Sequence, residues 1–110
     1  MSKAQKLKEL LLRDEISIAA GCFDGISARL VQEVGFDVAL LSGYGVSGSV
    51  LGAPDYGLLT MTEMATRTRN VANILSIPLI ADGDTGYGNP LNVRRTVQEY
   101  EMAGAAAIQL

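Results

Sequence analysis

The chain has 110 residues, which is enough for one ordinary domain. Hydrophobic residues make up 48% of it and charged residues 19%, so the composition excludes an intrinsically disordered chain. The net charge is −3, and no basic cluster exceeds a pair apart from Lys3, Lys6 and Lys8, which argues against a nucleic-acid partner. The chain contains no histidine and one cysteine, Cys22, so it holds no His-ligated zinc site, no Ser-His-Asp triad and no internal disulfide.

The sequence also lacks the signals of a membrane or secreted protein. No apolar run approaches the roughly 20 residues that span a bilayer. The N-terminal segment 1–13 is Lys-rich and amphipathic, without the apolar core and the cleavage site of a secretory signal. We therefore expect a soluble, cytoplasmic protein with no membrane partner.

Hydrophobic periodicity predicts helices and strands that alternate along the chain. Thr60 and Glu63 have the spacing of a capping box, and Asn89 followed by Pro90 starts a second well-marked helix. The stretch 42–57 contains five glycines and is predicted to be a loop with at most one short helical turn. In chain order, we expect a helix over 4–12, a strand over 16–20, a helix between Asp24 and Gly35, a strand over 38–41, the Gly-rich loop, a helix over 60–75, a strand over 77–81, a helix over 90–103 and a strand over 105–110.

Alternation of this kind predicts a parallel sheet joined by right-handed crossovers. Two architectures are open at this point. A doubly wound sheet would be nearly complete at 110 residues, whereas a (β/α)₈ barrel needs about 250 residues. Because the sequence stops within an apolar strand, we favour the barrel, with residues 1–110 as the N-terminal half of its single domain.

In both architectures, reactive side chains belong at the C-terminal ends of the strands. The first such end carries Cys22 and Asp24, which we interpret as a packed hydrophobe and a helix cap. The second carries residues 43–48, a formal match to the G-x-G-x-x-G motif of dinucleotide sites. Gly52 and Pro54 interrupt the long helix that such a site needs, so we expect the N–H groups of this segment to suit a carboxylate instead.

The third strand end is the strongest candidate for a functional site. Asp82 and Asp84 lie two residues apart just after a buried strand, and Asp55 follows the neighbouring strand. Mg²⁺ binds one or two carboxylates together with waters and substrate oxygens, so this pattern predicts a site for a metal-chelated small acid. The alternative interpretation assigns the same aspartates to turns and helix caps.

A set of segments forms a specific pattern: 42–45 (SGYG), 52–60 (GAPDYGLLT), 62–64 (TEM), 81–89 (ADGDTGYGN), 92–97 (NVRRTV) and 101–104 (EMAG). This pattern resembles the isocitrate lyase / phosphoenolpyruvate mutase superfamily. Methylisocitrate lyases, dimethylmalate lyases and carboxyphosphonoenolpyruvate phosphonomutases are the most similar groups. The likeness extends from about Gly21 to Leu110, and the block that contains both aspartates is its most specific part.

The resemblance implies an α/β fold, a (β/α)₈ TIM-type barrel, of which this chain supplies an N-terminal helix and about the first four strands. It also implies a Mg²⁺ cofactor, with Mn²⁺ as the alternative cation. Asp82 and Asp84 would hold the metal directly or through water, and Asp55 would belong to the metal's outer shell. The family usually has alanine between the two aspartates, where this chain has Gly83.

By the same resemblance, Ser42, Gly43 and Tyr44 would bind the carboxylate of a small-molecule substrate. The family's mobile catalytic loop follows the fourth strand, beyond Leu110, so no catalytic residue is expected within this chain, and Cys22 does not match the catalytic cysteine of the lyases. The full-length protein is expected to be a homo-oligomer, a tetramer.

The function implied is a Mg²⁺-dependent lyase that cleaves a C–C bond in a 2-hydroxy di- or tricarboxylate, similar to methylisocitrate or dimethylmalate, through an enolate intermediate. Within the same superfamily, the alternatives are a phosphonomutase that acts on a P–C bond and an oxaloacetate decarboxylase or hydrolase. Outside it, the alternatives are a non-catalytic barrel fragment and a nucleotide-binding domain based on residues 43–48.

Overall fold

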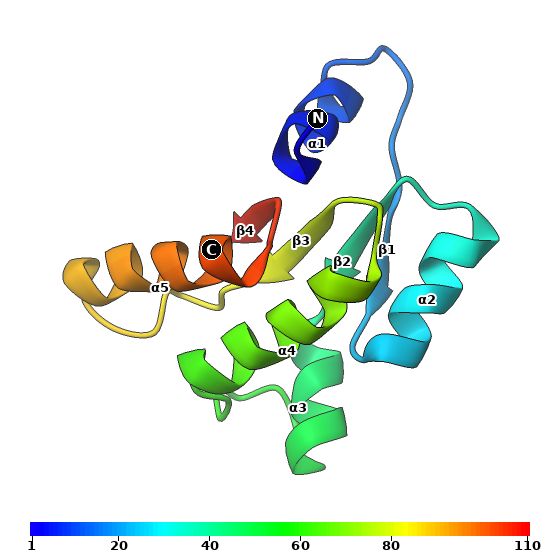
Figure 1. Ribbon diagram of the computed structural model, residues 1–110. Helices are drawn as coiled ribbons and strands as arrows, with labels where there is room; N and C mark the ends of the chain where they lie inside the picture. The colour runs from blue at the N-terminus through cyan, green and yellow to red at the C-terminus, as the bar shows by residue number, and fades with distance from the viewer.

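The computed structural model describes residues 1–110 and shows a parallel sheet with helices packed around it (Figure 1). In chain order the elements are α1 (Lys3–Leu11), β1 (Ala19–Cys22), α2 (Gly25–Val34), β2 (Val38–Leu41), α3 (Gly43–Leu51), α4 (Met61–Ile74), β3 (Leu79–Asp82), α5 (Pro90–Ala103) and β4 (Ala107–Gln109). The four strands lie in the order β1-β2-β3-β4, so each strand pairs with the one before it in the sequence.

The strand order of the sheet follows the sequence without reversal, and the helices that join the strands lie on one face. Leu41 and Leu79 pack in the larger core, together with residues of α2, α4 and α5, whereas Val38 and Ile80 belong to a smaller core with α1. A doubly wound sheet places its crossover helices on both faces and reverses its strand order. Here the order is sequential and the crossover helices share one face, which is the pattern of a (β/α)₈ barrel. The topology therefore decides between the two architectures left open by the sequence.

Helix α1 covers the end of the sheet that lies opposite α3 (Figure 1). Its buried residues Leu7 and Leu10 pack with Val38. The ammonium group of Lys3 donates a hydrogen bond to the carbonyl oxygen of Ala72 in α4, at 2.7 Å. The helix thereby seals the N-terminal ends of the strands and leaves their C-terminal ends open. None of the helices is long and apolar enough to cross a membrane.

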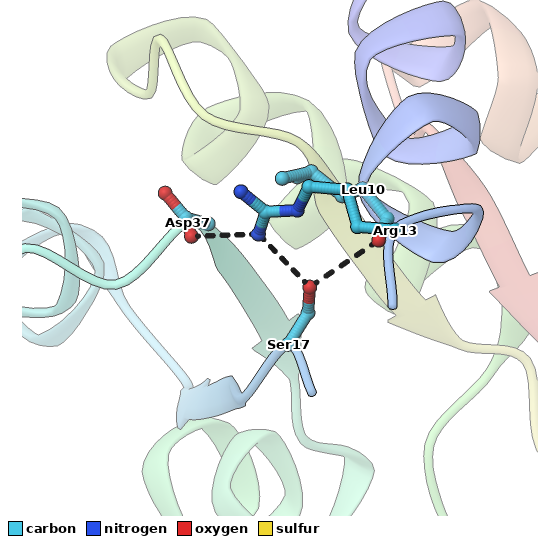
Figure 2. Close-up of polar contacts among 4 residues, drawn as sticks. All are labelled: Leu10, Arg13, Ser17 and Asp37. Atoms are coloured by element: carbon cyan, nitrogen blue, oxygen red, sulfur yellow. Dashed lines mark hydrogen bonds and ion pairs between the residues drawn. The ribbon is translucent and has the colours of Figure 1, made fainter. Parts of the chain in front are cut away.

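Polar contacts fasten the segment between α1 and β1 (Figure 2). The Arg13 guanidinium lies 3.3 Å from both the Ser17 hydroxyl and the Asp37 carboxylate. The Ser17 hydroxyl also lies 3.5 Å from the carbonyl oxygen of Leu10. These contacts hold Ser17 beneath α1 and outside the sheet, so the strand predicted over 16–20 begins only at Ala19.

The predicted helix caps are confirmed. Thr60 and Glu63 bond reciprocally at the start of α4, and the Asn89 side chain accepts hydrogen bonds from the first turn of α5. Gly35 and Gly104 end α2 and α5 in the left-handed conformation that glycine adopts without steric cost. Local sequence chemistry therefore sets most helix boundaries.

The predicted loop over 42–57 is wrong in its first half, because residues 43–51 form α3. The Ser42 hydroxyl caps this helix by accepting from the amide of Gly45, and Val46 and Ser47 are fully buried. Glycine is a poor helix former by about 1 kcal/mol per residue. Burial of one helix face outweighs that cost, and Gly45 also allows the close approach of Phe23, whose Cβ lies 2.7 Å from the place of a Cβ at residue 45.

We expect residues 1–110, produced alone, to associate or to melt without cooperativity. Strands β1 and β4 are both unpaired on their outer sides, and Ile16, Ile18 and Leu110 next to them are more than 60% exposed. Unpaired apolar edges recruit other chains. Sedimentation velocity and calorimetry measure this, and a monomer with one sharp melting transition would contradict the expectation.

Candidate metal and carboxylate site

Three carboxylates line one cavity of about 50 Å³ at the C-terminal ends of β2 and β3. They belong to Asp55, Asp82 and Asp84, and Gly43 and Tyr87 line the same cavity. No lysine or arginine lines it, so nothing in the lining neutralises the negative charge. The structure thus brings together the three aspartates that the sequence singled out.

Asp82, the last residue of β3, is held by two backbone amides. The amide of Gly43 donates to Oδ2 at 3.1 Å, and the amide of Asp84 donates to Oδ1 at 2.9 Å. A Cβ at position 43 would overlap Oδ2, so only glycine permits this contact. The resemblance implies that Gly43, with Ser42 and Tyr44, binds a substrate carboxylate; in this structure the Gly43 amide bonds to a carboxylate of the protein.

The turn after β3 has an unusual backbone. Asp84 (φ 51°) and Tyr87 (φ 63°) are the two non-glycine residues of the chain with positive φ. Such conformations cost on the order of 1 kcal/mol each and persist where the surroundings enforce them. Here the Thr96 hydroxyl donates to the carbonyl oxygen of Gly86 at 2.8 Å, which ties the turn to α5. Strain is concentrated at the candidate site.

Asp55 reaches the cavity from the loop between α3 and α4. The hydroxyl of Ser47, which is buried, lies 3.0 Å from the carbonyl oxygen of Ala53 and 2.9 Å from that of Pro54. The bond from Ser47 fixes the loop immediately before Asp55. The sequence pattern did not reveal this role, because a serine among glycines is typical of a loop.

Two tyrosines support the site from below, and sequence reasoning missed both. Tyr100 of α5 is buried, and its hydroxyl lies 2.9 Å from the main-chain oxygen of Asp82 and 3.3 Å from the Tyr87 hydroxyl. Burial raises the pKa of both phenols above the ordinary value, and the charges of Asp84, Asp82 and Asp55 raise the pKa of Tyr87 further. Tyr100 is spaced four residues from buried Thr96, which indicates a core position but not this contact.

The structure separates Tyr44 from the aspartates. The Tyr44 side chain is exposed and lines a broader depression of about 730 Å³ together with Phe23 and Pro54. Ser42 is used as the cap of α3. Of the residues expected to bind the substrate carboxylate, only Gly43 lines the cavity of the aspartates.

The aspartates fit a hard divalent cation. No group of three or more acidic or cysteine side chains is close enough to bind one ion directly. Mg²⁺ takes one or two carboxylates and fills its remaining positions with water or substrate oxygens. Asp82 and Asp84 would supply the carboxylates, and exposed Asp55 on the opposite loop is suited to a contact through water.

The geometry is unfavourable for a dinucleotide. A helix does begin within the glycine motif, contrary to expectation, but it has only nine residues. The amide of Gly43 is bonded to Asp82 and that of Gly45 to the Ser42 hydroxyl. A pyrophosphate requires such amides to be free at a helix N-terminus.

Cys22 and Asp24 have the structural roles predicted for them. The Cys22 side chain is 1% exposed and packs in the larger core. Burial, together with the nearby charge of Asp24, raises the pKa of its thiol to about 11. The carboxylate of Asp24 caps α2 by accepting from the amide of Ser27 at 2.8 Å, and this bond lowers its pKa.

The profile of the phosphoenolpyruvate phosphomutase family matches residues 7–110. The chain belongs to the PEP mutase/isocitrate lyase superfamily. It is 49% identical over its whole length to 2,3-dimethylmalate lyase of Eubacterium barkeri, and 48% identical over 92% of its length to the chloroplastic carboxyvinyl-carboxyphosphonate phosphorylmutase of Arabidopsis thaliana. The crystal structure of a phosphonopyruvate hydrolase complex with oxalate and Mg²⁺ superposes with a TM-score of 0.93, at 39% identity over 98% of this chain.

The chain spans only part of these superfamily members: 38% of the dimethylmalate lyase, 30% of the phosphorylmutase and 38% of the hydrolase. Its four parallel strands correspond to a part of their fold. A Cβ at Gly83 would lie 2.7 Å from Cδ1 of Ile108. In this chain the Ile108 side chain occupies the space that a methyl group at residue 83 would need.

We expect Gly43→Ala in the full-length protein to displace the Asp82 carboxylate. The added methyl group overlaps Oδ2, and forced contacts of this kind cost about 1–3 kcal/mol of stability. Urea unfolding measures the loss of stability, and Mn²⁺ titration measures how the displaced carboxylate changes cation binding. Gly48→Ala is the matched control, because it lies in the same helix with open space around it and should stabilise by about 0.5–1 kcal/mol. Equal behaviour of the two variants would contradict the role of Gly43.

We expect the Cys22 thiol to resist a thiol reagent at pH 8 until the protein unfolds. Because burial raises its pKa from 9.0 to about 11, its contribution to stability is complete below pH 9 and is lost between pH 9 and pH 11. The pH dependence of the free energy of unfolding, compared between wild type and Cys22→Ala, isolates this contribution. Rapid labelling of the folded protein would contradict the expectation.

Proposed function

We propose that the full-length protein is a Mg²⁺-dependent lyase that cleaves a C–C bond in a 2-hydroxy di- or tricarboxylate similar to dimethylmalate or methylisocitrate. The observation that carries the proposal is the cavity whose lining includes Asp55, Asp82 and Asp84 and no lysine or arginine. The 49% identity to 2,3-dimethylmalate lyase supports the reaction class, and the Mg²⁺ complex of the similar phosphonopyruvate hydrolase supports the cation.

In this proposal, the residues of this chain bind the cation and orient the carboxylates that hold it. Asp82 and Asp84 would hold the cation, and the amides of Gly43 and Asp84 keep the Asp82 carboxylate in place. When bound, Mg²⁺ supplies Lewis-acid stabilisation of negative charge on substrate oxygens, which amounts to several kcal/mol. A substrate whose charge is carried by carboxylates, and whose C–C cleavage yields a carbonyl fragment and an enolate fragment, matches that requirement.

The cysteine of this chain and the tyrosine bonded to the main chain of Asp82 are not suited to proton transfer to the substrate. Cys22 is buried with a raised pKa, and Tyr100 is buried beneath Asp82. We therefore assign the acid and the base of the reaction to the part of the full-length protein that follows Leu110. This chain contributes the electrophilic half of the site.

Phosphonomutase activity is the second candidate, because the chain is 48% identical to the Arabidopsis phosphorylmutase. Both reactions place an enolate-like fragment beside the same cation, so the residues of this chain serve either one. Full-length protein assayed with dimethylmalate, methylisocitrate and phosphonopyruvate separates them. Cleavage of a hydroxy acid supports the lyase, and turnover of phosphonopyruvate alone supports P–C chemistry.

We expect Asp82→Asn in the full-length protein to weaken Mg²⁺ binding and to lower turnover by on the order of a thousandfold, because it removes a stabilisation of several kcal/mol. Isothermal titration with Mg²⁺ and steady-state kinetics measure both effects. Asp37→Asn is the matched control, since Asp37 forms an exposed ion pair with Arg13 at the other end of the sheet. Wild-type turnover by Asp82→Asn at limiting Mg²⁺ would rule out the metal assignment.

A further inference from the structure

Two phenols and one main-chain carbonyl form a short polar chain beneath the cavity. The Tyr100 hydroxyl lies 2.9 Å from the main-chain oxygen of Asp82 and 3.3 Å from the hydroxyl of Tyr87. Tyr100 is 1% exposed and comes from α5, whereas Tyr87 is half-buried and lines the cavity of the aspartates. The three groups therefore connect α5, the turn and the last residue of β3.

The direction of these bonds follows from the number of protons. The carbonyl oxygen of Asp82 can only accept, so the hydroxyl proton of Tyr100 is used for that bond. The remaining contact then requires Tyr87 to donate its own proton to the Tyr100 oxygen. Both bonds consequently run one way, from Tyr87 through Tyr100 to Asp82.

These hydrogen bonds lie where the backbone of the protein is least regular. Asp82 is the last residue of β3, and two residues later Asp84 has a left-handed backbone. The carboxylate of Asp82 accepts a bond from the Gly43 amide, and the main-chain oxygen of Asp82 accepts one from the Tyr100 hydroxyl. Removal of the Tyr100 bond leaves the Asp82 carboxylate attached, and leaves the peptide group between Asp82 and Gly83 held only by the bond from the Gly83 amide to the carbonyl oxygen of Gln109, at 2.8 Å.

We propose that Tyr87 and Tyr100 are positioning residues for the cation site, acting in series to hold the main chain of Asp82 so that Asp82 and Asp84 are preorganised for a divalent ion. The inference rests on the proposed function, because it assumes that these aspartates bind the cation. Residues that do not touch the metal but hydrogen-bond to the residues that hold it typically contribute about 10- to 100-fold in metal affinity. Neither tyrosine touches the substrate in this proposal.

The experiment uses the full-length protein with Tyr100→Phe, Tyr87→Phe and the double variant, because phenylalanine keeps the ring and removes only the hydroxyl. Mn²⁺ alone is the probe, and electron paramagnetic resonance of free Mn²⁺ gives the dissociation constant. We expect Tyr100→Phe to weaken Mn²⁺ binding about tenfold or more, and Tyr87→Phe to weaken it less, since its 3.3 Å bond is longer.

Arrangement in series makes a sharper prediction. Tyr100→Phe breaks both bonds, so adding Tyr87→Phe should change Mn²⁺ affinity no further, and the double variant should match Tyr100→Phe. Independent roles predict instead that the two losses multiply. A double variant whose loss equals the product of the single losses would overturn the proposal.

Thr68→Val is the matched control. Its buried hydroxyl also donates to a main-chain carbonyl, that of Met64, but this bond lies within α4 and does not involve the turn after β3. We expect this control to shift the melting temperature of the metal-free protein without changing Mn²⁺ affinity. An equal loss of affinity in Thr68→Val would show that general destabilisation is responsible and would overturn the proposal.

The outcomes separate this inference from the function on which it rests. If wild type binds no Mn²⁺, both are overturned. If wild type binds Mn²⁺ and both tyrosine variants bind it equally well, only the positioning role is overturned. Should Tyr100→Phe fail to fold, Tyr87→Phe compared with Thr68→Val decides, because Tyr87 is only half-buried.

Discussion

The contact between the Gly43 amide and the Asp82 carboxylate is the constraint on which the candidate site depends. The two residues are 39 positions apart in the sequence, and parallel pairing of β2 with β3 brings them to the same edge of the sheet. The approach is possible only because residue 43 has no side chain. The result is a carboxylate whose two oxygens are both bonded to amides while it lines a cavity with Asp55 and Asp84.

Around this contact, regular structure supports an irregular turn. The backbone of Asp84 and Tyr87 is left-handed, which costs free energy locally. Thr96 and Tyr100, one turn apart on α5, each bond to a carbonyl oxygen of this segment. The helix therefore both covers the sheet and holds the site, so the stability of the core and the geometry of the aspartates are linked.

Much of this molecule could be predicted from local patterns. The caps at Thr60 and Asn89 and the end of α2 at Gly35 were predicted from short-range chemistry. The pattern failed at α3, because glycine content indicates a loop whereas burial of Val46 and Ser47 stabilises a helix. It was also silent on Tyr100, since a tyrosine on the apolar side of a helix carries no sign of which carbonyl its hydroxyl meets.

By itself, the sequence determined the alternation of helices and strands, the superfamily pattern and the aspartates worth testing, because these depend on residue type and spacing along the chain. Only the tertiary structure decided that the sheet winds in one direction, that Asp55 meets Asp82 and Asp84, and that Tyr44 lies apart from them. The physical reason is the distance along the chain over which each interaction acts. Periodicity and capping act within a few residues, whereas strand order and the direction of a side chain are set by packing between segments that the sequence does not place side by side.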